Sequence, residues 1–331
     1  MPGGPGIFHN LETTEKMRAD AVLPLLVRTM TWESPDVLSL SLAHPEGEQL
    51  PSWQAGAHID ISIEGIGTAQ YSLCGTLDAV EWRIAVLHQR EGKGVSRYIH
   101  KRLRPGERVL ASAPKNLFQL DPAPAYLFIA GGIGITPFLP MIEAANSNGR
   151  PWSLAYGGRS VATMSFIPAL HTYGSAVRFF PADSCGLIPV SDLLASSPTA
   201  AVYCCGPEPL IQAVQAACAA AGREAPHIER FGAAAPAAPR GPDQHFSIVL
   251  ARTGITLDVP PGRSIADVLE AHGVFVPTSC REGVCGSCET RVLSGEVEHR
   301  DSLLSEEEHR RGETMMVCVS RACGAKLTLD V

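Results

Sequence analysis

Three cysteines lie within nine residues in the stretch CREGVCGSC, Cys280 to Cys288. With Cys318 further along, the spacing is C-x4-C-x2-C followed by a distant fourth cysteine, the spacing of plant-type [2Fe-2S] ligation. Gly283 and Gly286 suit a loop around such a cluster, because glycine tolerates positive φ and lets backbone N–H groups point at sulfur. We therefore expect four cluster ligands: Cys280, Cys285, Cys288 and Cys318.

Two other interpretations of these cysteines remain open. A structural zinc site with four cysteine ligands usually pairs one C-x2-C with another, whereas only one such pair occurs here. Unligated thiols are the second alternative. Cys323 lies five residues beyond Cys318, and in a strand an odd offset turns two side chains to opposite faces. We therefore expect Cys323 to pack rather than to bind metal.

The size and charge of the chain limit the class of protein. A chain of 331 residues predicts two or three domains. The net charge of -7 leaves no basic field for nucleic acid or anionic lipid. The N-terminus lacks the pattern of a signal peptide, and no apolar run approaches the ~20 residues of a membrane span. We expect a cytoplasmic protein without nucleic-acid or membrane partners, whose clustered cysteines serve metal or redox chemistry.

Changes in pattern along the sequence divide the chain into domains. Short alternating apolar segments over residues 20–121 predict an antiparallel barrel or sandwich. Over residues 122–232, apolar strands alternate with helical patterns, which predicts a parallel α/β sheet. Residues 233–243, rich in alanine and proline, predict a semi-rigid linker. The domain that carries the cysteine cluster then spans residues 244–331.

Two glycine motifs follow apolar strands of the predicted α/β domain. AGGIGITPFLP opens a helix, so that backbone amides could approach a pyrophosphate at the helix N-terminus. YCCGPEPL ends a second strand at the sheet edge where α/β domains bind their ligands. The residues that we expect at this nucleotide site are Gly131, Gly132, Gly134, Ile135, Thr136, Cys205, Gly206 and Pro207.

The predicted barrel carries the motifs QYSLCG and REGKGVSRYIH. A tyrosine ring can pack on a flavin, a neighbouring serine can hydrogen-bond the ring edge, and a glycine turn before a helix can bind phosphate. Taken alone, Tyr71 would more often be a core aromatic and Lys93 a solvated surface charge. Together with the nucleotide motifs, they predict a flavin site formed by Tyr71, Ser72, Leu73, Lys93, Gly94, Val95 and Ser96.

This order of motifs resembles the phthalate dioxygenase reductase family, which includes vanillate demethylase reductases. The resemblance runs from about residue 22 to 331 and ends in the motif MVCVSRA. It implies an antiparallel FMN-binding β-barrel, a ferredoxin-reductase-type parallel α/β NAD domain and a C-terminal β-grasp ferredoxin. It also implies that electrons pass from NADH through FMN and the [2Fe-2S] cluster to a terminal Rieske-type oxygenase, either a dioxygenase or an O-demethylase.

The resemblance further implies roles for single residues. Ser72 would contact the flavin and Cys205 the nicotinamide. Phe231 matches the aromatic residue that ends the nucleotide domain beside the flavin, and the alternative is that it packs between domains. These three residues form the expected catalytic group. Negative charge in SEEEHR, Ser305 to Arg310, could steer a basic oxygenase, but a solvated helix face is the simpler interpretation.

One departure from the family pattern concerns the flavin phosphate. The pattern R-x-Y-S has an arginine where this chain has Ala69. The absence of this arginine could weaken FMN binding by roughly 1.5 to 3 kcal/mol unless Lys93 or Arg97 compensates. Arg159 could meet the 2′-phosphate of NADPH, whereas Asp183 resembles the acidic position of NADH users and would repel it, so we favour NADH.

Two functions of other classes stay open. A self-contained flavin diaphorase would reduce small acceptors without a partner, but it leaves the ferredoxin domain without a purpose. A zinc-binding scaffold module would contain neither flavin nor iron. The visible absorption of the protein separates these classes.

Overall fold

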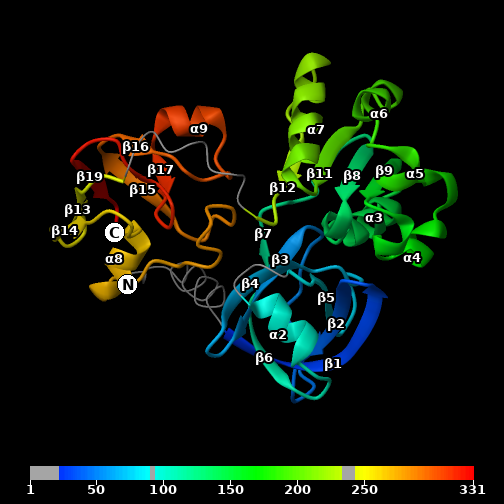
Figure 1. Cartoon of the computed structure of the whole chain (residues 1–331), viewed down its shortest axis with the longest axis horizontal. Helices are drawn as coiled ribbons and strands as arrows, with labels where there is room; N and C mark the ends of the chain where they lie inside the picture. The colour runs from blue at the N-terminus through cyan, green and yellow to red at the C-terminus, as the bar shows by residue number, and fades with distance from the viewer. Residues whose placement is uncertain (1–21, 90–93, 233–242) are drawn as a thin grey trace, which may run out of the picture. The chain divides into compact units, whose positions relative to one another are not determined.

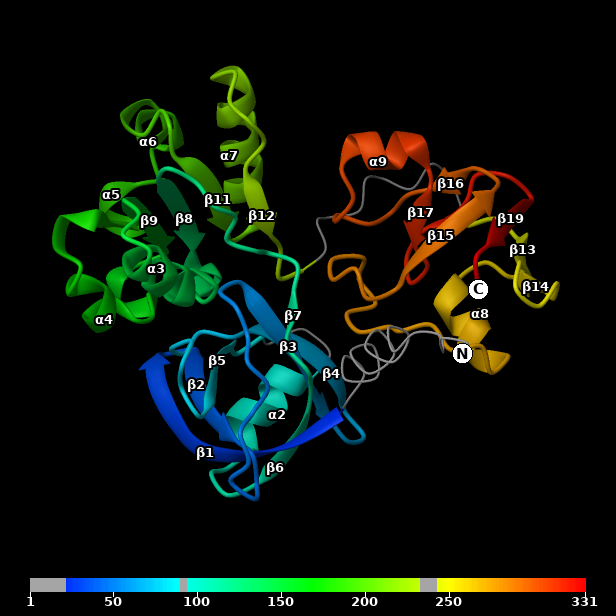
Figure 2. The same cartoon turned by 180° about the vertical axis from the view of Figure 1, so that it is seen from behind.

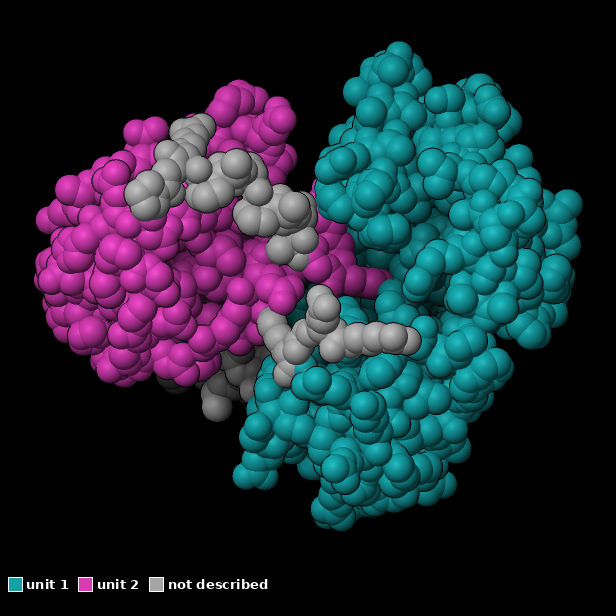
Figure 3. Space-filling model, in the orientation of Figure 1, with its two compact units in different colours: residues 1–229 teal, residues 230–331 magenta. Residues whose placement is uncertain are grey.

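The computed structural model describes residues 22–89, 94–232 and 243–331. Along the chain, an antiparallel sheet, a parallel sheet with helices and a mixed sheet follow one another, as the sequence predicted (Figure 1, and from behind in Figure 2). The chain divides into two compact units, residues 1–229 and 230–331, coloured separately in Figure 3. Lys93 and residues 233–242 of the expected linker lie outside the described residues.

The first sheet of unit 1 is a closed antiparallel barrel. Its strands follow the order β4-β3-β6-β1-β2-β5, and β7 pairs with β3. A bridge between Leu73 and Ile84 joins the chain after β4 to β5 and closes the ring. Alternate side chains fill the interior, as in other small barrels. The elements are β1 Val22–Ser34, β2 Val37–Ala43, β3 Ala57–Ile63, β4 Gly67–Ser72, β5 Trp82–Leu87, α2 Val95–Lys101, β6 Arg108–Ser112 and β7 Lys115–Asn116.

The second sheet of unit 1 is parallel, with the strand order β10-β9-β8-β11-β12. Its strands are β8 Tyr126–Gly131, β9 Trp152–Gly158, β10 Val177–Pro181, β11 Ala201–Cys205 and β12 His227–Glu229. Its helices are α3 Phe138–Ser147, α4 Ile167–His171, α5 Ala182–Cys185, α6 Val190–Ser196 and α7 Glu208–Ala220, with 3-10 turns η2 Gly132–Ile135, η3 Val161–Thr163 and η4 Gly174–Ala176.

Helices cover both faces of this sheet, because alternate side chains of each strand point to opposite sides. Leu127 and Ile129 of β8 join the cluster that contains α6 and α7. Tyr126 and Phe128 join the cluster that contains α3. That second cluster also includes barrel residues such as Cys74, so the barrel and the α/β domain share a core within unit 1.

Unit 2 has the arrangement of a β-grasp ferredoxin. Its five-stranded mixed sheet has the order β14-β13-β19-β15-β17, and β16 pairs separately with β18. Helix α8 begins at a capping box in which Ser264 and Asp267 bond each other's backbone amides, and its apolar residues enter the core of this unit. The elements are β13 Phe246–Leu250, β14 Thr256–Val259, α8 Ile265–Ala271, β15 Glu289–Ser294, β16 Val297–Glu298, α9 Glu306–Arg311, β17 Thr314–Met316, β18 Arg321–Ala322 and β19 Lys326–Leu329.

No helix in the described part of the chain is both long enough and apolar enough to span a membrane.

Candidate functional site

The two glycine motifs of unit 1 meet at one point of the parallel sheet. Strand β8 has β9 on one side and β11 on the other, so the strand order reverses between β8 and β11. Ligands of open α/β sheets bind outside the carboxyl ends of the strands at such a switch point. GGIGITP follows β8 and CGP follows β11, so both motifs lie at this edge.

Close packing explains two of these glycines. A Cβ atom on Gly134 would lie 2.3 Å from the carbonyl oxygen of Cys205, and one on Gly131 would lie 2.6 Å from Cδ of Pro207. Gly132 instead has φ of +57° with open space around its Cβ position. Gly131 and Gly134 therefore let the two loops approach each other, and contact of these motifs with a nucleotide remains a prediction.

The chain after Gly132 differs in detail from the helix that the sequence predicted. A 3-10 turn comes first, and α3 begins only at Phe138. Thr136 is buried, and its hydroxyl donates to the carbonyl of Ile133 at 3.0 Å. This hydroxyl therefore stabilises the turn, and Ile135 is buried in the core beside it.

Three polar side chains from three elements converge beside this edge. Ser72 ends β4 of the barrel, Cys205 ends β11 and Glu229 ends β12. The Ser72 hydroxyl donates to Oε2 of Glu229 at 3.3 Å, and the Cys205 thiol donates to the same oxygen at 3.9 Å. The structure thus brings together two of the three expected catalytic residues and adds a carboxyl group.

Glu229 was not predicted from the sequence. Its one local signal is a carboxylate at the end of the short strand in HIERFG, at the ligand-binding edge of the sheet. Burial raises the pKa of Glu229 to about 8, although hydrogen bonds from Ser72 and Cys205 lower it in part. Burial and the neighbouring Glu229 also raise the pKa of Cys205 well above its usual value. At neutral pH both groups therefore hold their protons.

The expected flavin residues lie along β4 and at the start of α2. Tyr71 is partly buried against the barrel core, Leu73 is fully buried, and burial raises the pKa of the Tyr71 hydroxyl. Gly94 precedes α2 with φ of +94°, and the following residue, Val95, is buried. The hydroxyl of Ser96 accepts a hydrogen bond from the amide of Gln89 at 3.2 Å.

Arg97 is a candidate to replace the arginine that this chain lacks at position 69. Ala69 pairs with Ile61 in the barrel wall and packs against the barrel core. A Cβ atom on Gly94 would lie 3.6 Å from a terminal guanidinium nitrogen of Arg97, so this exposed cation sits at the predicted phosphate turn. Among the two residues that could compensate for Ala69, Arg97 is the one that the structure describes.

The remaining unit 1 residues of the predicted site are also exposed. Arg159 and Asp183 follow the paired strands β9 and β10, and the amide of Asp183 donates to the carbonyl of Arg159 at 3.1 Å. The two residues expected to determine the preference for NADH or NADPH are therefore joined by a backbone hydrogen bond. Phe231 is 40% exposed and belongs to unit 2, so its role remains a prediction.

The four cysteines of unit 2 gather into one buried site. A hydrogen bond with Cys280 is the main cause that raises the pKa of Cys285, and one with Cys318 is the main cause that lowers the pKa of Cys288. The amide of Glu282 donates to the Cys280 sulfur at 3.3 Å, and the amide of Gly283 hydrogen-bonds the Cys318 sulfur.

This donor set fits a [2Fe-2S] cluster better than a zinc ion. Each of the four thiols interacts with at least one other, and four cysteine thiolates are the ligands of a plant-type cluster. A structural zinc site with four cysteines usually pairs one C-x2-C with another, whereas this chain has only the one between Cys285 and Cys288. Gly283 and Gly286 have φ of +70° and +68°, as the sequence predicted.

Two expectations about the surface of unit 2 have different outcomes. Cys323 follows the short strand β18 and is exposed, so the prediction that it packs is wrong: β18 ends at Ala322, and the alternation of a strand does not extend to Cys323. Helix α9 has no buried residues, as a solvated face would. Glu308 forms a capping box with Ser305, and Glu307 forms an ion pair with Arg311. Part of the negative charge of α9 is therefore paired within the helix.

Comparisons with known proteins agree with this arrangement. Residues 248–323 match the 2Fe-2S iron-sulfur cluster binding domain. A putative toluene-4-sulfonate monooxygenase system reductase subunit of Comamonas testosteroni is 38% identical, over 95% of this chain and all of its own. The structure of phthalate dioxygenase reductase, described as transferring electrons from pyridine nucleotides to [2Fe-2S], is 34% identical with a TM-score of 0.71, over 94% of this chain and 98% of its own.

A further similar structure is a much longer protein. An intact type IV self-sufficient cytochrome P450 monooxygenase is 38% identical with a TM-score of 0.83 over 94% of this chain. The chain spans only 41% of that protein.

Proposed function

Because the chain belongs to the phthalate dioxygenase reductase-like family, we propose that it is the reductase component of a two-component oxygenase, delivering electrons from NADH to a terminal Rieske-type oxygenase. One observation carries this proposal. A single chain combines the polar group Ser72, Cys205 and Glu229 at a nucleotide-binding sheet edge with a four-cysteine site that fits a [2Fe-2S] cluster. The first can serve a two-electron donor, and the second a one-electron acceptor.

Residues of the chain have defined tasks in this proposal. Bound FMN would supply the conversion of a two-electron hydride donor into single electrons, and the cluster would supply a one-electron carrier. Tyr71 and Ser72 would orient the flavin ring, and Arg97 would bind its phosphate. Cys205 would pack against the nicotinamide, with the protonated carboxyl group of Glu229 beside it. Asp183 would repel a 2′-phosphate and so favour NADH over NADPH. We place the enzyme in the cytoplasm.

An anaerobic titration tests the electron path. The purified protein is titrated with NADH or, separately, with NADPH, while visible absorption and electron paramagnetic resonance are recorded. We expect flavin bleaching together with the signal of a reduced [2Fe-2S] cluster, at lower concentrations of NADH than of NADPH. A colourless protein would support the zinc scaffold instead, and flavin bleaching without any cluster signal would support a diaphorase.

The identity of the acceptor needs a separate comparison, because one similar protein is a self-sufficient cytochrome P450 monooxygenase. NADH oxidation is measured with a Rieske-type oxygenase and with a P450 haem domain as alternative acceptors. We expect stimulation by the oxygenase. Stimulation by the haem domain alone would overturn this part of the proposal.

A further inference from the structure

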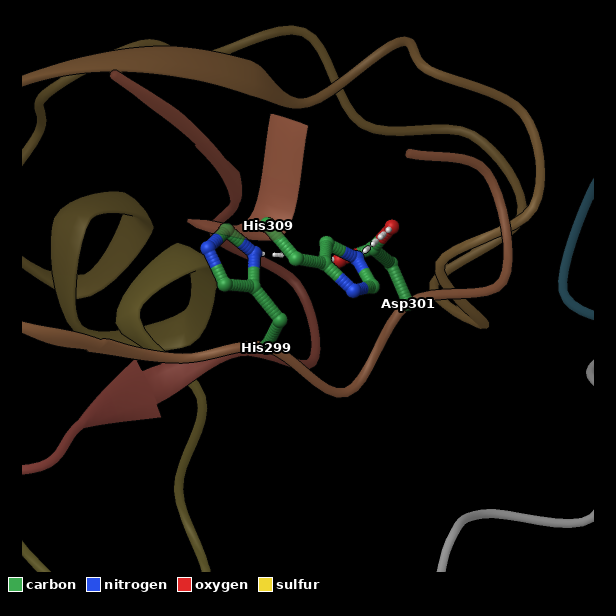
Figure 4. Close-up of side chains that lie close together, drawn as sticks. All are labelled: His299, Asp301 and His309. Atoms are coloured by element: carbon green, nitrogen blue, oxygen red, sulfur yellow. Dashed lines mark hydrogen bonds and ion pairs between the residues drawn. The ribbon is translucent and has the colours of Figure 1, made fainter. Parts of the chain in front are cut away.

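A second group of metal-binding side chains lies in unit 2. His299 and Asp301 lie between β16 and α9, and His309 lies on α9 (Figure 4). Their candidate ligand atoms all lie within 4.8 Å of one another, and they form the one such group of His, Cys, Asp or Glu in residues 22–89, 94–232 and 243–331. The two imidazole rings are stacked, with centroids 4.3 Å apart.

Several polar atoms of this group are buried without the hydrogen bonds that such atoms usually make. The side chain of His299 is 6% exposed and that of Asp301 is 0% exposed. Among the described residues, both ring nitrogens of His299 and Oδ1 of Asp301 have no hydrogen-bond partner. Nδ1 of His299 lies 3.5 Å from Oδ1 of Asp301, close enough for an ion pair but without hydrogen-bond geometry. Buried polar atoms are seldom left unpaired, so this arrangement needs an explanation.

The surrounding backbone holds the carboxylate in place. Oδ2 of Asp301 accepts hydrogen bonds from the amides of Leu303 and Leu304 at 3.2 and 2.9 Å. Nε2 of His309 lies 3.3 Å from the same oxygen. Such contacts orient the ligands of metal sites. They occupy one carboxylate oxygen and leave Oδ1 available beside the His299 ring.

We propose that His299, Asp301 and His309 bind one divalent transition-metal ion, for which zinc is the best match, separately from the [2Fe-2S] site. Two imidazoles and one carboxylate favour zinc over magnesium or calcium, which prefer oxygen ligands. Three protein ligands leave a fourth position for water. One ion would bind both a ring nitrogen of His299 and Oδ1 of Asp301. The ion pair between His309 and Asp301 involves Oδ2 and leaves those two atoms without a hydrogen bond from any described residue.

This site is connected to the loop that holds the cluster. The amide of Ser302 donates to the carbonyl of Gly283 at 3.0 Å. A Cβ atom on Gly283 would lie 2.9 Å from Cα of Asp301. A bound ion would therefore hold the segment that carries Asp301 against the Cys280–Cys288 loop and stabilise unit 2.

The test uses the holoprotein, with flavin and cluster in place, under anaerobic conditions and without chelators. Wild type and His309→Asn are dialysed against graded zinc concentrations, and bound zinc, iron content and the thermal midpoint are measured. His309 is partly exposed on α9, so its replacement should leave the fold intact. The matched control is His245→Asn, which changes a histidine that pairs with Asp258 elsewhere in unit 2.

We expect wild type and His245→Asn to bind one zinc ion with unchanged iron content and a raised thermal midpoint. His309→Asn should bind it about tenfold more weakly or worse, because one of three ligands is lost. Equal zinc uptake by His309→Asn and wild type would overturn the proposal. So would the absence of zinc uptake by wild type, or uptake accompanied by loss of iron, which would place zinc at the cysteines.

Discussion

Protonation of Glu229 couples the stability of unit 1 to pH. Burial raises its pKa from 4.5 to about 8, against the opposite effect of hydrogen bonds from Ser72 and Cys205. Between these two values the folded state binds one more proton than the unfolded state. The free energy of unfolding therefore contains a stabilising contribution that is complete below about pH 4.5 and lost as the pH rises to about 8.

Glu229→Gln, which is neutral at every pH, should remove this dependence. We expect it to stabilise the protein at pH 9 by about 1–2 kcal/mol, a value reduced for the solvent contact of the side chain. At pH 5 the effect should be close to zero. Differential scanning calorimetry at both pH values measures it, with the exposed Glu224→Gln as the matched control. Equal effects of Glu229→Gln at the two pH values would contradict the assignment of a proton to this group.

Binding of the flavin phosphate should depend on Arg97. We expect Arg97→Ala to weaken FMN binding about tenfold, because a charge-assisted hydrogen bond contributes roughly 1.5–3 kcal/mol. Ala69→Arg should tighten binding by a similar factor, since it restores the arginine of the family pattern. Fluorescence titration of flavin-free protein with FMN gives both dissociation constants.

The control for this pair lies on the same helix. Arg102 is also exposed, at the C-terminal end of α2, and Arg102→Ala should leave the dissociation constant unchanged. If Arg97→Ala and Arg102→Ala behave alike, Arg97 does not bind the phosphate. An unchanged constant for Ala69→Arg would mean that the chain binds FMN without a cation at that position.

At the scale of elements, the contact between the β8 and β11 loops should not tolerate a larger residue. Gly134→Ala would place Cβ 2.3 Å from the carbonyl oxygen of Cys205, so one backbone segment must move. We expect a loss of about 1–3 kcal/mol in the free energy of unfolding and a raised KM for NADH, because Cys205 moves with that segment.

Gly324→Ala is the matched control for this substitution. Gly324 has no heavy atom within 4 Å of its Cβ position and no positive φ. Denaturant unfolding should therefore give a change within about 0.5 kcal/mol. A Gly134→Ala variant as stable as this control would show that the two loops are loosely packed.

The same loops show what the sequence could predict. The strand ends were predictable because glycine motifs after apolar strands mark the ligand edge of a parallel sheet, and the cysteine spacing is a local pattern. Glu229 was not, because its partner Ser72 is 157 residues away along the chain and no local pattern joins them. The packing role of Gly134 was missed for the same reason, since its neighbour Cys205 comes from another strand.

At the scale of the whole molecule, the proposed function comprises two activities, the reduction of flavin by NADH and the delivery of electrons through the cluster. One substitution can distinguish them. Cys288→Ser removes a ligand of the cluster in unit 2 and leaves every residue of unit 1 unchanged. NADH-dependent reduction of ferricyanide, an acceptor that can take electrons directly from flavin, should stay within about twofold of wild type, because the flavin and nucleotide residues are intact. Electron delivery to a Rieske-type oxygenase should fall by about 100-fold or more, because the one-electron carrier is lost.

The control for this substitution is Cys185→Ser, which changes an exposed cysteine of unit 1 and should affect neither activity. Iron analysis of Cys288→Ser establishes that the cluster is absent. If oxygenase-coupled turnover persisted without iron, electrons would leave the chain directly from the flavin, and unit 2 would serve to dock the partner rather than to conduct. A parallel loss of both activities would mean that the two units depend on each other for folding, a result that calorimetry of the same variant would detect as a lowered midpoint for unit 1.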